Sequence, residues 1–225
     1  MITQSKIFEV YEAIRGKNRR ILLTKNLVPG KTVYDEGLFR EKGTEYREWN
    51  AKKSKLAAMI LRGALNIGIR KNDVILYLGS STGTTVSHVS DIVGKDGFIF
   101  AVDPAPRVMR ELVFVAEDRK NIAPILADAN KPAEYVGNVA LVDAVYQDIA
   151  QRNQLQIFLK NVKMFLKDEG CGLLAVKARS IDVTRKPKGI FNEIRQDLEK
   201  EMTIIDYRIL EPFQLGHCMF ICKKK

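Results

Sequence analysis

Hydrophobic and polar positions divide the chain from residue 74 onward into two alternating kinds of segment. Short apolar runs, typical of buried strands, alternate with longer stretches in which apolar residues recur at helical spacing. The pattern predicts strands at 74–78, 98–102, 123–127, 142–148 and 170–177, and helices at 84–93, 107–118, 151–166 and 189–202. Segments 203–210 and 217–223 predict an antiparallel edge hairpin. We therefore expect an α/β fold with a mostly parallel, seven-stranded, doubly wound sheet.

The first 50 residues follow a different pattern. Two short strands and the turn between them are predicted there, at 7–12, 20–25 and 16–18. From Ser54 an apolar stripe with helical spacing runs to about Gly68. We expect a small N-terminal β domain over residues 1–50 and a main domain over residues 51–225.

The junction after the strand at 74–78 carries two glycines, Gly79 and Gly83, followed by hydroxyl residues in the first turn of a helix. Such a turn lets backbone N–H groups approach a ligand, and the helix start adds unpaired donors. A P-loop needs four residues between its glycines and a following lysine, whereas this turn encloses three and continues with Thr84. The dinucleotide pattern also fails, because Ser81 replaces its second glycine. The turn favours a nucleoside cofactor without a pyrophosphate.

The strand at 98–102 is followed by Asp103, which lies twenty residues after Gly83. This is the spacing at which an acidic residue binds the hydroxyl pair of a ribose. Asp103 is therefore our candidate ribose ligand. An alternative remains open, because Asp103 could instead cap the helix that starts near Arg107.

Ligands of such sheets bind outside the carboxyl ends of the strands. Asp103, Asp128 and Asp148 all fall at those ends, so we expect three aspartates around one cleft. Acidic groups suit a ligand that offers ribose hydroxyls, an adenine amine and an α-amino group. S-adenosylmethionine offers all three, and its sulfonium is a cation. The same rule selects Gly79 to Thr85, Asp103, Asp128-Ala129, Asp148 to Gln151, and Lys177 to Arg179.

Lys177 lies at the end of an apolar strand, where a charged side chain needs a reason. A methyl group on a sulfonium is already activated, so its transfer mainly requires a nucleophile held in line at about 3–3.5 Å. Where that nucleophile is a hydroxyl, a lysine can act as the base and an aspartate can orient it. The alternative is a lysine that simply reaches solvent from a strand end.

The amino-acid composition limits which partners and which cellular compartment the sequence predicts. The chain has 225 residues, is 46% hydrophobic, and contains no run near the roughly 18 apolar residues of a membrane span. It begins without the apolar core of a signal peptide, so we expect a cytoplasmic protein with no membrane partner. The three cysteines include no C-x-x-C pair, which predicts reduced thiols and no metal site.

The net charge of +10 and the pI near 9.5 favour a polyanionic partner, of which nucleic acid is the natural candidate. Each basic cluster taken alone is equally typical of a solvated face, and the total charge is what makes the set suggestive. The clusters lie at 17–20, at 52–55, at Arg179 with 185–188, at 223–225, and at Lys160, Lys163 and Lys167 on one predicted helix face.

Several longer motifs resemble the fibrillarin family, the 2′-O-ribose methyltransferases of box C/D ribonucleoprotein particles. The resemblance covers nearly the whole chain, and without an arginine- and glycine-rich tail it is closest to the short archaeal form. The motifs are Tyr46-Arg-Glu-Trp-Asn50, Ser54-Lys-Leu-Ala-Ala58, Tyr77 to Asp91, Asp148-Ile-Ala-Gln151 and Val176-Lys-Ala-Arg-Ser-Ile-Asp182. The resemblance implies a Rossmann-like S-adenosylmethionine-dependent methyltransferase fold.

The resemblance also implies four catalytic residues, Lys55, Asp148, Lys177 and His217. Lys177 would be the base or the group that positions the 2′-hydroxyl, Asp148 would orient it, and Lys55 and His217 would complete the acceptor pocket. Fibrillarins usually carry charged residues just before this histidine, whereas here it follows Gln214-Leu-Gly216. The implied cofactor contacts are Gly79, Thr84, Thr85, Asp103, Pro104, Asp128, Ala129, Asp148, Ile149, Ala150 and Gln151.

We therefore expect an S-adenosylmethionine-dependent enzyme that methylates ribose 2′-hydroxyls of ribosomal RNA, with transfer RNA as a further substrate. The resemblance implies a particle with a box C/D guide RNA, a Nop-family scaffold protein and a ribosomal-type protein that binds kink-turns. Target choice by base pairing would explain why the sequence shows no RNA-reading module. Two alternatives are a non-catalytic RNA-binding subunit of such a particle and a nucleotide-linked oxidoreductase. An oxidoreductase of this kind would need the dinucleotide-binding glycine spacing, which this chain lacks. His88, the other histidine, is expected to have a packing or surface role.

Overall fold

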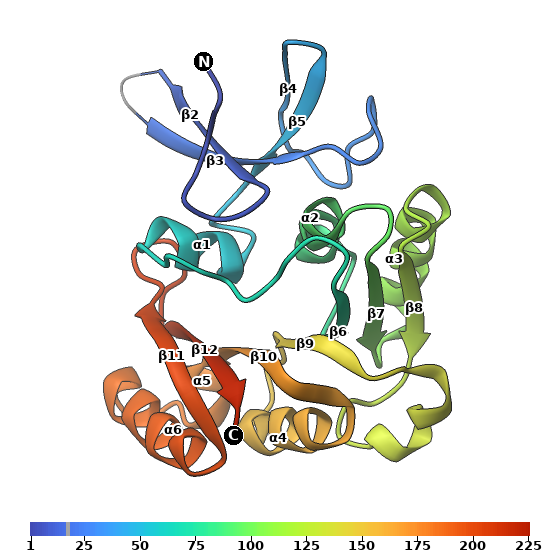
Figure 1. Ribbon diagram of the computed structural model, residues 1–225. Helices are drawn as coiled ribbons and strands as arrows, with labels where there is room; N and C mark the ends of the chain where they lie inside the picture. The colour runs from blue at the N-terminus through green and yellow to red at the C-terminus, as the bar shows by residue number, and fades with distance from the viewer. Residues whose placement is uncertain (17–18) are drawn as a thin grey trace.

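The computed structural model describes residues 1–16 and 19–225 and contains two β-sheets (Figure 1). The predicted turn at 16–18 lies partly outside these residues. A smaller N-terminal sheet sits above helices α1 (Lys55–Leu61) and α2 (Thr84–Val93), which in turn cover the larger sheet. The predicted domain boundary at residue 50 falls between the last strand of the small sheet, which ends at Trp49, and α1.

The N-terminal sheet is antiparallel and has five strands. Their bounds are β1 (Thr3–Gln4), β2 (Val10–Arg15), β3 (Arg19–Lys25), β4 (Leu38–Glu41) and β5 (Thr44–Trp49), in the order β1-β2-β3-β5-β4. The predicted first strand, at 7–12, was placed too early. Ser5 Oγ accepts a hydrogen bond from Ile7 N at 3.0 Å, and Glu9 has a φ of 54°, so the chain turns there before β2 begins.

The large sheet has seven strands, as predicted, in the order β11-β12-β10-β9-β6-β7-β8. Strands β8, β7, β6, β9 and β10 run parallel, and β12 pairs antiparallel with both β10 and β11 to form the edge hairpin. The bounds are β6 (Val74–Leu78), β7 (Phe98–Asp103), β8 (Ile122–Leu126), β9 (Val142–Gln147), β10 (Leu166–Lys177), β11 (Met202–Ile209) and β12 (His217–Lys224).

Helices cover both faces of this sheet. The further bounds are α3 (Pro106–Asp118), α4 (Gln154–Phe165), α5 (Ala178–Ile181) and α6 (Pro187–Glu201), with short 3₁₀ turns η1 (Pro132–Glu134) and η2 (Val136–Asn138). The prediction for α2 matches its observed bounds, whereas α5 was not predicted. Because α4 ends at Phe165, Lys167 lies in β10 and does not share a helix face with Lys160 and Lys163.

Helix α1 begins where predicted and ends well before Gly68. Ser54 caps it by accepting a hydrogen bond from Ala57 N. Gly63 has a φ of 93°, a left-handed conformation that glycine adopts readily and that stops the helix after Arg62. The apolar residues beyond this point, such as Ile67, are buried from an irregular segment, which explains why the periodicity suggested a longer helix.

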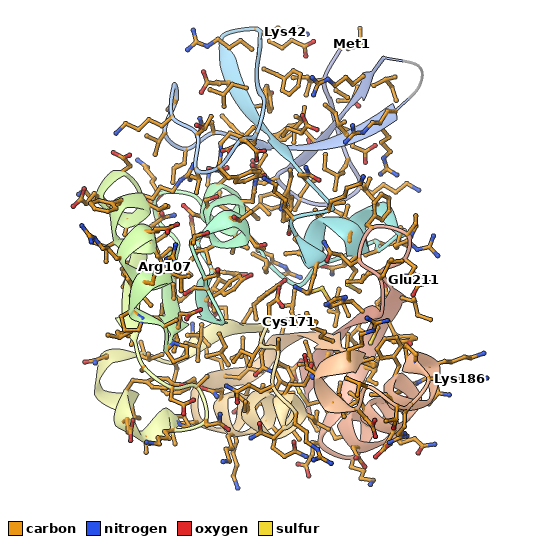
Figure 2. All side chains as sticks on the ribbon, turned by 180° about the vertical axis from the view of Figure 1, so that it is seen from behind. Met1, Lys42, Arg107, Cys171, Lys186 and Glu211 are labelled. Atoms are coloured by element: carbon orange, nitrogen blue, oxygen red, sulfur yellow. The ribbon has the colours of Figure 1, made fainter. Side chains whose placement is uncertain are left out.

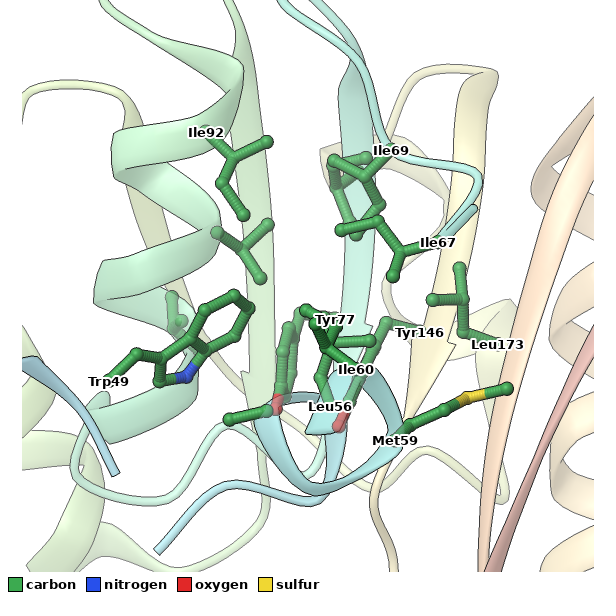
Figure 3. Packing of buried hydrophobic residues seen from close by; sticks show 14 of the residues in the cluster. Trp49, Leu56, Met59, Ile60, Ile67, Ile69, Tyr77, Ile92, Tyr146 and Leu173 are labelled. Atoms are coloured by element: carbon green, nitrogen blue, oxygen red, sulfur yellow. The ribbon is translucent and has the colours of Figure 1, made fainter. Parts of the chain in front are cut away.

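Two apolar cores lie on opposite faces of the large sheet. One is shared with α1, α2 and α3, and the other with α4 and α6. Figure 3 shows α1 residues such as Leu56 and Ile60 packing toward Tyr77 and Tyr146 on the adjacent strands β6 and β9. The two tyrosine rings stack with centroids 4.3 Å apart. This packing places α1 directly over the centre of the sheet.

A buried ionic cluster joins the N-terminal sheet to α2. Asp91 on α2 accepts a hydrogen bond from Arg47 Nη1 of β5 at 2.9 Å and another from Arg119 Nη1 at 2.6 Å. Arg47 also pairs with Glu36 at 2.6 Å, and the side chains of Arg47, Glu36 and Asp91 have no exposed surface. The two arginines and two carboxylates balance in charge, so they can be buried together.

His88 lies in the same interface and is fully buried, so of the two roles expected for it the structure shows packing and not a surface position. Its Nδ1 is 2.7 Å from Thr24 Oγ1, its Nε2 is 2.7 Å from the Tyr34 hydroxyl, and its ring stacks on Trp49. Burial lowers the pKa of His88 well below its ordinary value, helped by the positive charge of Arg47. The imidazole is therefore neutral near pH 7 and serves as a hydrogen-bonding core group.

Cys171, Cys218 and Cys222 are free thiols. Within residues 1–16 and 19–225, the structure has no group of three or more His, Cys, Asp or Glu side chains that could hold a metal ion. None of the helices in this part of the chain is long and apolar enough to cross a membrane.

Candidate active site

The carboxyl ends of four neighbouring strands, β9, β6, β7 and β8, form one continuous edge of the large sheet. Asp148 follows β9, Gly79 follows β6, Asp103 ends β7, and Asp128 lies just beyond β8. Hydrogen bonds tie these ends together, since Asp148 N donates to Leu78 O at 2.9 Å and Gly79 N donates to Val102 O at 2.9 Å. The topology therefore brings the three predicted aspartates and the glycine turn to one edge.

The glycine turn depends on the absence of side chains at two positions. Gly79 has a φ of 81°, and a Cβ there would lie 2.3 Å from the carbonyl oxygen of Asp148. Gly83 has a φ of 92°, and a Cβ there would lie 2.9 Å from Leu112 Cδ1. Real Cβ atoms do not approach backbone oxygens so closely, so only glycine lets β6 turn against the end of β9.

Asp103 is held by backbone donors on both sides. Its Oδ2 accepts a hydrogen bond from Ser81 N at 2.9 Å, and its Oδ1 accepts one from Ala105 N at 3.0 Å. The N-cap of α3 is Ala105, which lacks a side-chain cap, so Asp103 precedes the cap position by two residues. An ionised carboxylate has about four acceptor sites, which leaves capacity for a ribose. The Asp103 carboxylate therefore stabilises the local turn and still has acceptor sites free at the position predicted for the ribose.

The loops after β8 and β9 are also connected. Asn130 Nδ2 donates to Gln151 Oε1 at 2.8 Å and lies 3.3 Å from Asp128 Oδ1. Ala129 is buried, and its carbonyl accepts a hydrogen bond from Asn161 at 2.9 Å. Asn130 was not predicted, because an asparagine in a loop carries no pattern that would distinguish it. It holds two predicted cofactor-binding segments at a fixed separation.

The remaining candidates at the turn differ in their surroundings. Thr84 is partly buried in the first turn of α2, and Thr85 is buried, with its hydroxyl donating to Ser54 Oγ at 3.1 Å. Pro104 and Ala150 are exposed, and Ile149 is partly buried. Ser80 Oγ is buried without a hydrogen-bond partner in the part of the chain that the structure describes. A ligand at this turn would supply such a partner.

The four residues implied as catalytic lie together beside this edge. Lys55 Nζ, at the start of α1, forms an ion pair with Asp148 Oδ2 at 2.8 Å, and both side chains are about four-fifths buried. Lys177 ends β10 and is the register partner of His217, which begins β12. The charges of Lys55, Asp148 and Lys177 all act on the pKa of His217, so the four groups share one electrostatic environment.

A buried glutamine holds the backbone of Lys177. Gln154, at the start of α4, accepts a hydrogen bond from Lys177 N at 3.0 Å and donates to Lys177 O at 3.3 Å. Its own carbonyl accepts a hydrogen bond from Gln147 Nε2 at 2.6 Å. Gln154 was missed because a polar residue at a helix start is ordinary in sequence. Its role is visible only in the structure, where it is completely buried against the backbone of Lys177.

His217 is expected to be neutral at pH 7. Partial burial lowers its pKa, and the positive charges of Lys55 and Lys177 lower it further, while its hydrogen bond to Leu215 O and Asp148 oppose that shift. Because the chain has only two histidines, imidazole resonances can be followed individually by NMR and assigned with a His217→Gln variant. We expect the His217 resonance to titrate below pH 6.5, while His88 keeps its neutral shift throughout the folded range. A His217 midpoint above 6.5 would contradict this electrostatic description.

A family model described as Fibrillarin matches residues 1–225. The chain belongs to the fibrillarin family. A curated relative from Methanocaldococcus jannaschii, named fibrillarin-like rRNA/tRNA 2′-O-methyltransferase, is 50% identical over 218 residues, which are 96% of this chain and 94% of that protein. The predicted resemblance to fibrillarin is therefore confirmed.

Two solved fibrillarin structures match this chain over nearly its whole length. Aeropyrum pernix fibrillarin, crystallised with natively bound S-adenosyl-L-methionine, superimposes with a TM-score of 0.91 at 44% identity and covers 99% of this chain and 97% of its own. A fibrillarin/Nop5p complex superimposes with a TM-score of 0.87 at 38% identity, covering 97% of this chain and 99% of its own. An Aquifex aeolicus methyltransferase at 13% identity and a TM-score of 0.55 shares the fold alone. The predicted methyltransferase fold is thus confirmed.

Proposed function

We propose that this fibrillarin transfers the methyl group of S-adenosylmethionine to ribose 2′-hydroxyls of ribosomal RNA, and of transfer RNA. The observation that carries the proposal is the Lys55–Asp148 ion pair at the edge where the glycine turn ends, with Lys177 and His217 paired on the adjacent strands. The curated relatives named rRNA/tRNA 2′-O-methyltransferase support both the reaction and the substrates.

The edge of the sheet suits S-adenosylmethionine. Gly79 gives the backbone room to approach the cofactor, and Asp103 is held in place with free acceptor capacity for its ribose. Among residues 1–16 and 19–225, Ser80 Oγ has no hydrogen-bond partner, which makes it a further unsatisfied polar atom at this turn. Asp128 and Asp148 flank the same edge, where their charge favours the cationic sulfonium and the amine groups. The bound cofactor supplies an activated methyl group, and the protein supplies the acceptor and the geometry.

The chain's own residues prepare the hydroxyl. Lys177 accepts the proton of the 2′-hydroxyl at Nζ while the hydroxyl oxygen forms its new bond to the methyl carbon and the carbon–sulfur bond breaks. Asp148 orients the amine, and Lys55 holds the Asp148 carboxylate through their ion pair at 2.8 Å. His217, neutral near pH 7, completes the acceptor pocket from the strand paired with β10. Gln154 keeps the Lys177 backbone in register.

A Nop-family protein is a partner of this fibrillarin, as the related fibrillarin/Nop5p complex supports. We also propose a box C/D guide RNA and a kink-turn-binding protein in the same particle, because base pairing would supply the target choice that no RNA-reading module in the sequence provides. The net charge of +10 suits such a particle. A cytoplasmic location is part of the same proposal.

The test is methyl transfer from labelled S-adenosylmethionine to a target RNA in particles reconstituted with a guide RNA, the Nop-family protein and the kink-turn-binding protein. We expect methylation at the single ribose that the guide selects, and none when the guide is changed to pair elsewhere. Particles that assemble and bind S-adenosylmethionine yet leave the target unmethylated would contradict the proposed function. Particles that assemble without cofactor affinity would favour the non-catalytic scaffold.

Replacing Asp103 by alanine should weaken cofactor binding. The variant loses the ribose acceptor and leaves Ser81 N and Ala105 N without their side-chain partner. We expect the dissociation constant for S-adenosylmethionine, measured by calorimetry, to rise by about tenfold or more, since hydrogen bonds to charged groups contribute about 1.5–3 kcal/mol. Asp96→Ala, an exposed aspartate between α2 and β7, is the control and should leave the constant unchanged. An unaltered constant for Asp103→Ala would refute the ribose assignment.

A further inference from the structure

A cavity of 640 Å³ opens beside the catalytic residues and is separate from the glycine turn. Lys177 lies at its edge, so the cavity meets the acceptor side of the reaction. Its other walls come from α5, from the start of α6, and from the loop at 210–216 that joins β11 to β12. In Figure 2 this loop, marked by Glu211, lies beside α1. The cavity therefore lies on the Lys177 side of the site, and none of the predicted cofactor contacts is among its lining residues.

Arg179 lines this cavity and is exposed. No carboxylate lies within ion-pair distance of it among residues 1–16 and 19–225, whereas the nearby Arg185 pairs with Glu193 at 2.7 Å. A guanidinium without a carboxylate partner can form two parallel hydrogen bonds to a phosphate. Ser180, next to it on the cavity wall, adds a hydroxyl donor. This end of the cavity suits an RNA phosphodiester.

Leu215 forms the opposite wall and is 75% exposed. The loop that carries it is held firmly, because Gln214 Nε2 donates to Ala51 O at 3.0 Å and to Lys52 O at 2.7 Å. The carbonyl of Leu215 is also bonded to His217 Nδ1 at 2.8 Å. A rigid loop thus displays an apolar side chain two residues from His217. Leucine side chains pack against bases in proteins that bend DNA, and an exposed leucine beside the acceptor site can make the same kind of apolar contact with a nucleotide.

We propose that Arg179 binds the backbone phosphate next to the acceptor ribose and that Leu215 packs against the sugar and base of the same nucleotide. The proposal rests on the proposed function and assigns the RNA contacts that this function requires. An RNA strand fits these walls better than an apolar protein segment, because the basic side chains of Lys177 and Arg179 outnumber the one carboxylate in the lining, that of Glu211, and only Leu215 and Pro187 are apolar. The Glu211 carboxylate accepts a hydrogen bond from Gly216 N at 3.3 Å within its own loop.

The test compares Arg179→Gln and Leu215→Ala with wild type in reconstituted particles. We expect Arg179→Gln to raise KM for target RNA by about tenfold with kcat within about threefold, and to reduce the slope of log affinity against log salt by about 0.7, the value for one phosphate contact on a single strand. Arg179→Lys should restore the salt slope and part of the affinity. Leu215→Ala should raise KM by about fivefold and leave the salt slope unchanged.

Two control variants are matched in chemistry and lie outside the cavity. Arg110→Gln removes an exposed arginine of α3, and Val183→Ala truncates an apolar side chain that is 78% exposed just beyond α5. Both should leave KM and the salt slope unchanged. Target-RNA affinity of the assembled particle, measured by fluorescence anisotropy, is read alongside turnover. The two RNA contacts can thus be tested even if the wild-type particle transfers no methyl group. Such a result would count against the proposed function and not against the RNA contacts.

Specific outcomes would overturn the inference. An Arg179→Gln particle with wild-type RNA affinity and salt slope would remove the phosphate contact. A Leu215→Ala variant that binds RNA normally but loses the Nop-family partner in a pull-down would reassign this wall to a protein interface. A Leu215→Ala variant with normal KM and a shifted acid limb in its pH profile would show that the side chain acts through His217 instead.

Discussion

Lys177→Ala is expected to slow methyl transfer by about 10²-fold or more, while the affinity for S-adenosylmethionine stays within a few-fold of wild type. The reason is positional, because Lys177 ends β10 on the acceptor side and pairs in register with His217, away from the glycine turn. Its loss removes the group that takes the hydroxyl proton but none of the predicted cofactor contacts. Single-turnover methylation in a reconstituted particle measures the chemical step directly.

The control for this variant is Lys120→Ala, which removes an exposed lysine just before β8, at the opposite edge of the sheet. It should methylate like wild type. Lys177→Arg tests charge against proton transfer, since arginine keeps the charge but does not act as a base near neutral pH. Unchanged single-turnover rates in Lys177→Ala would remove this residue from the mechanism. A parallel loss of cofactor affinity would instead indicate a disturbed strand end.

Asp91→Ala is expected to destabilise the fold by about 3–5 kcal/mol, the usual cost of removing one partner from a buried ionic cluster. Asp91 accepts hydrogen bonds from Arg47, Arg119, Thr24 Oγ1 at 2.7 Å and Leu27 N at 3.0 Å. Without it, two buried arginines share only one remaining carboxylate, Glu36, which pairs with Arg47. The free energy of unfolding from urea titration measures the loss.

An exposed ion pair provides the comparison for Asp91. Asp118 pairs with Lys31, and both side chains are substantially exposed, so Asp118→Ala should cost less than about 1 kcal/mol. The difference between the two variants isolates the effect of burial. Equal costs for Asp91→Ala and Asp118→Ala would show that the buried cluster contributes no more than a surface pair, contrary to the burial of its side chains.

The alternation of apolar runs and helical stripes was sufficient to predict the large sheet and the strand ends that carry the site. Strand β6 and helix α2 match their predicted bounds. The glycine turn between them marks in the local sequence where β6 ends and where α2 begins. Asp103, Asp128 and Asp148 reach one edge for a reason that is also visible in sequence, since parallel strands present their carboxyl ends together.

Features that depend on long-range contacts could not be predicted from periodicity. The buried partners Arg47 and Asp91 lie 44 positions apart and carry charges that usually indicate a surface. The same limitation hid Gln154, whose role depends on a backbone 23 positions away. Helix α1 was predicted too long because residues such as Ile67 are apolar for tertiary reasons, although the backbone there is irregular. The family resemblance, and not the pattern, supplied Lys55 and His217.

The contact between Gly79 and the Asp148 carbonyl has a consequence for how such an enzyme can diversify. Because this backbone contact leaves no room for even one methyl carbon, any side chain at position 79 would push the glycine turn away from Asp148, the residue that pairs with Lys55. The segments at 178–187 and 211–216 contain neither partner of this contact, so we expect substitutions there to leave the spacing between the glycine turn and the Lys55–Asp148 pair unchanged.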